Sequence, residues 1–192
     1  MESTMSRQQG PRRPRRIDAI ENEARVRQAA EVVLRRVGSA MTMDDVAAEA
    51  GVSKGTVYST FGSRNQLLEE MAILFFDRAH DLYVEALQAP SAWDALAELF
   101  LEPTIQVTSA ARDAMNPDRP EDAVKKAGRR FFEALDALIE KGKGEGSIRA
   151  DVSIRHFEVL FRGLGLALQP YSPAYRELMH EGGLIILKGM RA

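Results

Sequence analysis

The feature that most constrains the fold of this chain is a helix-sized segment that is broken twice within about twenty residues. Residues 47–68 read AAEAGVSKGTVYSTFGSRNQLL, with breaks at Gly51 and at the FGS of residues 61–63. Upstream, Thr42 is followed three residues later by Asp45, a spacing typical of a helix N-terminus. Glycine is favoured just after a helix because it adopts positive φ without strain. The segment is therefore predicted to form two short helices joined by a tight turn, a helix-turn-helix.

The second short helix is predicted to expose most of its polar side chains. Ala47 and Val52 are small or branched apolar residues that allow two helices to cross closely, Val57 is predicted to hold the second helix inward, and Phe61 is expected to be core. Hydroxyls, an ammonium group and a tyrosine can reach the phosphates and base edges of a major groove. The outward-facing set is Lys54, Gly55, Thr56, Tyr58, Ser59 and Thr60.

The segment TMDDVAAEAGVSKGTVYSTFGSRNQLL, residues 42–68, resembles the DNA-binding signature of TetR-type transcriptional repressors. That signature reads approximately T-x-x-x-I-A-x-x-A-G-V-S-x-G-T-L-Y-x-H-F-x-S-K-x-x-L. The resemblance extends more loosely upstream through Ala29, Ala30 and Gly38, and elsewhere it covers only length and helical plan. Ser59 and Thr60 depart from it, since the family often has a histidine or an aromatic residue there, so the operator sequence cannot be inferred.

The resemblance implies a role in DNA binding for residues on both sides of the turn. Thr42 would offer its hydroxyl and backbone N–H to a phosphate, which the helix dipole favours, although it could serve only as an N-cap. Arg64, where the family usually has lysine, could bind a phosphate bidentately. Tyr58 could instead pack against the first helix. The phosphate contacts predicted are Thr42, Lys54, Thr56, Tyr58 and Arg64; Gly55, Ser59 and Thr60 lie nearest the bases, and Ser53 completes the predicted DNA-binding set.

Positive charge is concentrated at the start of the chain. Residues 1–65 carry 11 basic and 8 acidic side chains, whereas residues 66–192 carry 15 basic and 20 acidic side chains. This asymmetry suits a chain whose N-terminal part binds a polyanion while the remainder forms a separate domain. Residues 1–16 contain five arginines and are predicted to be a disordered arm, with PRRPRR held extended by its prolines. Its arginines could enter a minor groove; a solubilising tail is the alternative. The predicted contacts are Arg12, Arg13, Arg15 and Arg16.

The remaining chain is predicted to be helical. Apolar spacing predicts helices at about 21–37, 64–89, 120–141, 153–168 and 173–189, with a further helix from Ser91 that breaks near residues 101–103. The glycine-rich residues 142–146 are predicted to be a flexible connection. With no strand pair and no repeat, the prediction is an all-α fold: an arm (1–16), a helix-turn-helix DNA-binding domain (17–65) and a helical effector-binding and dimerisation domain (66–192).

Composition excludes several functions. The chain has no cysteine, which excludes disulfides and thiolate chemistry, and 45% hydrophobic with 28% charged residues is ordinary for a globular protein. No apolar run approaches the roughly 20 residues that span a bilayer, and the N-terminal arginines are not followed by the apolar stretch of a secretory signal. Together with the lack of cysteine, this predicts an intracellular, cytoplasmic protein. The histidines are scattered and no catalytic motif is present, so neither a metal, a cofactor nor an enzymatic activity is predicted.

The body of the chain is predicted to pair two subunits and to hold an effector. A single helix-turn-helix reads few base pairs, so a homodimer that places two modules one DNA turn apart is expected on double-stranded DNA. The resemblance implies that the last two helices pair; monomer core is the alternative. The predicted interface residues are Phe157, Leu160, Phe161, Leu164, Leu168, Leu178 and Ile185.

Large, mostly aromatic side chains of the central helices could line a cavity for a small apolar or amphipathic effector. The resemblance implies that an inducer binds at this site. The alternative for each residue is that it belongs to the ordinary hydrophobic core. These residues are Phe76, Tyr83, Trp93, Phe100, Met115, Phe131 and Phe132. The sequence thus predicts a homodimeric transcriptional regulator, most simply a repressor that an effector releases from a palindromic operator. The alternative is an effector-independent DNA-binding protein, either architectural or an activator.

Overall fold

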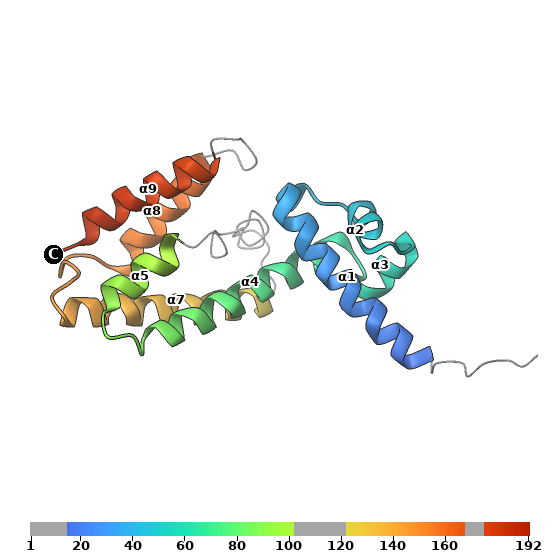
Figure 1. Ribbon diagram of the computed structural model, residues 1–192, viewed down its shortest axis with the longest axis horizontal. Coiled ribbons are helices and arrows are strands. Elements are labelled where there is room, and N and C mark those ends of the chain that lie inside the picture. The colour runs from blue at the N-terminus through green and yellow to red at the C-terminus, as the bar shows by residue number, and fades with distance from the viewer. Residues whose placement is uncertain (1–14, 102–121, 168–174) are drawn as a thin grey trace, which may run out of the picture.

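The computed structural model describes residues 15–101, 122–167 and 175–192, and these residues are helical with short connections (Figure 1). An isolated antiparallel bridge joins Ile148 to Arg191. The predicted all-α fold is confirmed. No helix among the described residues is long and apolar enough to cross a membrane. The elements are α1 (Arg15–Val37), the 3-10 turn η1 (Gly38–Ala40), α2 (Met43–Ala50), α3 (Lys54–Phe61), α4 (Arg64–Ala86), α5 (Ala92–Leu101), α7 (Asp122–Gly144), α8 (Ile154–Ala167) and α9 (Tyr175–Met190).

The helices enclose two separate hydrophobic cores, and α4 contributes to both. The first core joins α1, α2 and α3 to the first turns of α4, through Leu67 and Met71. The second core begins at Ala72 of α4 and continues through α5, α7, α8 and α9. Figure 1 shows α4 running out of the N-terminal bundle and along α7, with α8 and α9 together at the far side of the body. The first core thus extends past residue 65 along α4.

Helix α1 begins earlier than the sequence analysis predicted. It runs from Arg15, six residues before the expected start at residue 21. The expected start rested on apolar spacing alone, which locates the buried face of a helix rather than its first residue. Arg15 and Arg16, expected in an extended arm, are therefore the first residues of α1, and Arg12 and Arg13 lie outside the described residues.

The glycine-rich stretch at residues 142–146 is packed, which corrects the prediction of a flexible connection. Helix α7 continues to Gly144, and Gly146 adopts φ of +70° just after it. The backbone N–H groups of Ser147 and Ile148 both donate to the carbonyl of Gly142, at 3.0 and 3.1 Å. A Cβ on Gly142 would meet Ile148 Cδ1 at 2.5 Å. Glycine at position 142 lets the returning chain pack directly against the helix there.

Other boundaries agree with the sequence to within a few residues. Helix α4 ends at Ala86 rather than residue 89, and α8 and α9 lie within the predicted ranges or one residue beyond. The backbone N–H of Asp94 donates to Ser91 Oγ at 3.2 Å, at the predicted start of α5. The predicted break at 102–103 and the predicted starts at residues 120 and 173 lie outside the described residues.

Candidate nucleic-acid interface

The first helix of the candidate interface is fixed at its N-terminus by a capping box. Thr42 is the N-cap of α2: Asp45 N–H donates to Thr42 Oγ1 at 3.1 Å, and Thr42 N–H donates to Asp45 Oδ2 at 2.8 Å. The Thr42 hydroxyl also donates to that carboxylate, at 2.7 Å. These hydrogen bonds to the ionised form hold the pKa of Asp45 below its usual value. The N-cap role of Thr42 is confirmed, and the two donors expected to reach a phosphate are engaged by Asp45.

The turn between α2 and α3 has the geometry that the sequence predicted. Gly51 ends α2 in the left-handed region, at φ +64° and ψ +36°, and its N–H donates to the carbonyl of Ala48 at 3.3 Å. Val52 N–H donates to the carbonyl of Ala47 at 3.1 Å. Ser53 then caps α3, with its Oγ accepting from Thr56 N–H at 3.3 Å. Local hydrogen bonds thus set the angle between the two helices.

Helix α3 is anchored on one side and exposed on the other. Val57 is fully buried and Phe61 is 4% exposed, whereas Tyr58 between them is 44% exposed. The guanidinium of Arg27 lies 6.0 Å from the centre of the Phe61 ring and bonds to Glu70 of α4. The predicted inward positions of Val57 and Phe61 are confirmed. An eight-residue helix held by so few apolar side chains leaves its polar face open to a large partner.

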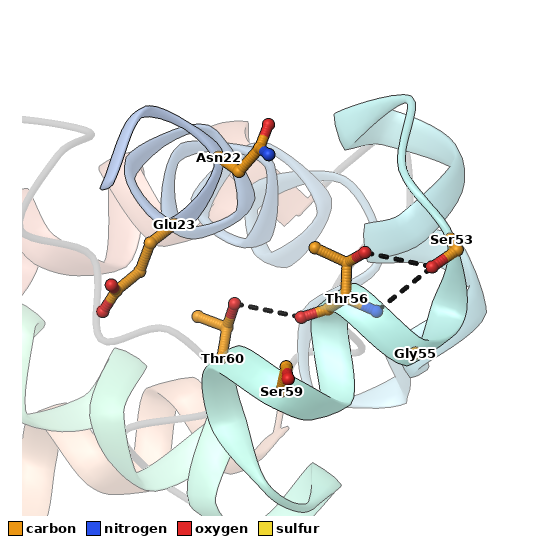
Figure 2. Close-up of a pocket in the computed structure, with 7 residues that line it drawn as sticks. All are labelled: Asn22, Glu23, Ser53, Gly55, Thr56, Ser59 and Thr60. Atoms are coloured by element: carbon orange, nitrogen blue, oxygen red, sulfur yellow. Dashed lines mark hydrogen bonds between the residues drawn. The ribbon is translucent and has the colours of Figure 1, made fainter. Parts of the chain in front are cut away.

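A polar hollow of about 510 Å³ separates the exposed face of α3 from the N-terminal half of α1 (Figure 2). Figure 2 shows Asn22 and Glu23 of α1 across from Thr56 and Thr60 of α3. Thr60 Oγ1 donates to the carbonyl of Thr56 at 3.1 Å, and the Thr56 hydroxyl lies 3.0 Å from the hydroxyl of Ser53. The lining residues are Asn22, Glu23, Ser53, Gly55, Thr56, Ser59 and Thr60.

The hollow gathers five of the predicted DNA-binding residues and adds two that the sequence analysis missed. Asn22 and Glu23 lie about thirty residues upstream of α3, in a polar stretch of α1 without a motif of its own. Only the crossing of α1 over α3 reveals them. Among the other predicted residues, Tyr58 is exposed on α3, and the side chains of Arg15 and Arg16 lie outside the described part of the chain.

The two cations of residues 42–64 are both engaged within the protein. Arg64 Nε donates to the carbonyl of Met41 at 2.9 Å, which ties the start of α4 to the end of η1. Lys54 Nζ donates to Asp44 Oδ2 at 2.8 Å, so the first turn of α3 is tied to the first turn of α2. Both side chains remain exposed enough to meet a phosphate. Each would bring its charge to DNA from a defined position.

The aromatic residues predicted to line an effector cavity form a packed cluster in the body. Phe76 and Tyr83 are 1% exposed, and their ring centres lie 5.9 and 5.5 Å from that of Phe131. Phe132 is 4.9 Å from Phe131, and Trp93 is half-buried beneath the Arg191 guanidinium at 5.3 Å. Burial raises the pKa of Tyr83 above its usual range. The side chain of Phe100 and all of Met115 lie outside the described residues.

The predicted partner surface on α8 and α9 divides into exposed and buried residues. Leu160, Leu178 and Ile185 are 50%, 43% and 71% exposed, and Val159 is also exposed. Phe157 is instead 4% exposed and belongs to the second core. Its expected role at the interface is corrected, because its side chain points into its own subunit. The side chains of Phe161 and Leu164, and all of Leu168, lie outside the described residues.

Similarity to known proteins differs between the N-terminal helix-turn-helix module and the helical body. Residues 26–71 match the family described as "Bacterial regulatory proteins, tetR family". The HTH-type transcriptional regulator AlkX of Mycobacterium tuberculosis is 41% identical over 59 residues, which are 31% of this chain and only 28% of that regulator. This relative therefore supports the N-terminal module and says nothing of the body.

Solved structures extend the similarity to the whole fold. A TetR transcription regulatory protein from Mycobacterium vanbaalenii is 26% identical, with 93% of this chain and 100% of that chain covered, at a TM-score of 0.60. A TetR transcriptional regulator from Streptomyces coelicolor is 22% identical, with 88% of this chain and 98% of that chain covered, at a TM-score of 0.62. This similarity shows the fold alone.

The module and the body together define a class of protein, a helix-turn-helix regulator whose DNA-binding domain stands on a helical body. Within that class, residues 26–71 match the TetR-type DNA-binding module, and the chain as a whole is similar to TetR transcriptional regulators of known structure. Regulators of this type are DNA-binding proteins rather than enzymes, in agreement with the prediction from the sequence. They bind double-stranded DNA and form dimers.

Proposed function

We propose that this chain is a homodimeric repressor that occupies a palindromic operator through α3 and is released by a small-molecule effector, acting in the cytoplasm. The observation that carries the DNA-binding part is the division of α3 into two faces. Val57 and Phe61 anchor the helix in the first core, while Tyr58 and Ser59 stay exposed. A helix presented in this way can enter a major groove with its docking on the module unchanged.

The dimer is supported by the apolar surface of α8 and α9. Val159, Leu160, Leu178 and Ile185 are large hydrophobic residues exposed on this adjacent pair of helices. Exposed apolar patches of this kind mark interaction surfaces. In a dimer paired through α8 and α9, the two α3 helices would have to lie about one helical turn apart on DNA, because dimers of such modules bind half-sites at that spacing.

The effector is supported by the aromatic cluster and by the path of α4. Phe76 and Tyr83 belong to α4, whose first turns also belong to the core beneath α3. A small apolar or amphipathic molecule that separated these rings would shift α4 and with it the spacing of the two modules. Coupling between such sites is typically about 1–3 kcal/mol.

The packed state of the same cluster favours a second candidate function. Phe76, Tyr83 and Phe131 contact one another and are nearly inaccessible. A body filled by its own side chains fits a DNA-binding protein that needs no effector, either an activator or an architectural protein. Release from DNA by a small molecule separates the two candidates.

Footprinting on the DNA upstream of the chain's own gene tests this proposal, with and without a panel of apolar and amphipathic compounds. We expect a protected palindrome that the Lys54→Met variant protects less well. Lys143→Met is the matched control, because it removes a lysine from the last turn of α7. Absence of any protected palindrome would reject the operator. Protection that no compound relieves would favour the effector-independent protein.

A further inference from the structure

The ion pair between Lys54 and Asp44 joins the two helices of the helix-turn-helix. Lys54 is the first residue of α3 and Asp44 the second residue of α2, and their Nζ and Oδ2 atoms are 2.8 Å apart. Both side chains are exposed, at 52% and 66%. The hydrogen bond to Asp44 raises the pKa of Lys54. In the protein without DNA, the ammonium group thus already has an anionic partner.

Lys54 is also the lysine that the interface would use to hold a phosphate. Residues 42–64 contain two cations, Lys54 and Arg64, against three acids. Arg64 is anchored to the carbonyl of Met41. An ammonium group is a compact charge whose donors turn toward the nearest anion. A phosphate beside α3 and the carboxylate of Asp44 would therefore compete for the same group.

Of the three acids in residues 42–64, Asp44 is the one positioned to compete with a phosphate for the ammonium group of Lys54. Its neighbour Asp45 is held by the backbone and side chain of Thr42 in the capping box. Glu49, the third acid of the segment, pairs with Arg36 of α1 at 2.9 Å. The carboxylate of Asp44 faces α3 instead and contacts Lys54.

We propose that Asp44 is a positioning residue that lowers DNA affinity by occupying Lys54 in the free protein, so that a DNA phosphate must displace its carboxylate. This inference rests on the proposed DNA-binding function. Exposed ion pairs contribute little to stability, so a phosphate can open this one. Asp44 therefore tunes affinity rather than blocking binding.

Asp44→Asn tests the inference, measured as the dissociation constant for the footprinted operator between 50 and 200 mM salt. We expect binding about fivefold tighter, because a phosphate no longer has to displace the carboxylate from Lys54, and a slope of affinity against salt that is nearly unchanged, because the number of phosphate contacts is the same. Thermal unfolding should change little, since asparagine replaces the carboxylate with an amide of the same shape and the capping box uses Asp45. Glu49→Gln is the matched control: it removes one negative charge from α2 away from Lys54, and we expect no tightening.

A Lys54→Met background separates competition from simple repulsion. If Asp44 acts through Lys54, Asp44→Asn should have almost no effect when residue 54 is methionine. Equal tightening in both backgrounds would overturn the inference in favour of direct repulsion between Asp44 and DNA. Weaker binding of Asp44→Asn would show that Asp44 orients Lys54, and unchanged binding would show no role; both outcomes also overturn it. Failure of the wild-type protein to bind any defined site would instead reject the proposed function.

Discussion

Val57→Ala should loosen the DNA-binding module while leaving the body intact. Val57 is fully buried in the first core, which it shares with Phe61, Leu67 and Met71. No residue of α3 belongs to the second core. The substitution therefore removes an anchor of α3 without touching the packing of α7 to α9.

The magnitude follows from the atoms removed. Val57→Ala deletes the equivalent of two methylene groups, each worth about 0.8 kcal/mol when buried. This gives roughly 1.6 kcal/mol of lost transfer free energy, and incomplete collapse of the cavity raises the cost to about 2–3 kcal/mol. At about 1.4 kcal/mol per factor of ten, the opening equilibrium of the module should rise by roughly 30- to 140-fold.

Amide hydrogen exchange measures this opening helix by helix. The amides near the end of α3, such as Gly62 N–H, which donates to Tyr58 at 2.8 Å, should exchange faster by that factor. Amides in the middle of α7 should keep their rates, because their core is separate. Ser59→Ala is the control, since Ser59 is exposed on the same helix and its loss should leave exchange unchanged.

Two results would refute this reasoning. An equal gain in exchange for α3 and α7 would show that the two cores unfold as one cooperative unit. Unchanged exchange in α3 would show that Val57 does not anchor the helix. In either case α3 could not be treated as a separately docked reading element.

Three further predictions concern the elements around α3. Gly51→Ala should cost about 1 kcal/mol in chemical denaturation, because φ of +64° strains an alanine although no atom lies within 4 Å; Gly51→Asn should cost less. The pKa of Asp45 is lowered by hydrogen bonds from Thr42, so its stabilisation is present above about pH 4 and lost as pH falls through the folded-state value. Thermal unfolding followed against pH should show this loss, and Asp45→Asn should remove it. Glu31 and Arg78 form two hydrogen bonds of 2.6 and 3.1 Å between α1 and α4; a double-mutant cycle should give about 0.5–1 kcal/mol of coupling, and zero coupling would mean that the pair is not held in solution.

The sequence predicts the helix-turn-helix well because its signals are local. A capping pair such as Thr42 and Asp45 acts within one turn of helix, and Gly51 acts through its own backbone angle. Such signals are present in any chain that contains the residues at the right spacing. The start signal at Thr42 and the breaks at Gly51 and residues 61–63 therefore agree with the observed bounds of α2 and α3.

The features that the sequence missed depend on contacts between distant segments. Ile148 packs against Gly142 and the chain returns onto the helix by hydrogen bonds to its carbonyl, so a glycine-rich stretch that resembles a linker is a fixed turn. Asn22 and Glu23 join the hollow only because α1 crosses α3. Phe157 follows the apolar spacing of its helix, but spacing alone does not tell a core face from a partner face. Each of these needs the tertiary arrangement.

Helix α4 is the element through which body and module must communicate. Its residue Leu67 is buried in the same core as Val57, so the start of α4 cannot move without α3. Arg27 binds Glu70 on the module side of the boundary between the cores, and Glu31 binds Arg78 on the body side. Because α1 is thus tied to α4 on both sides of that boundary, bending at the boundary would have to break an ion pair. A displacement of α4 in the body would therefore reorient the whole module, and a change in the spacing of two α3 helices is its expected consequence.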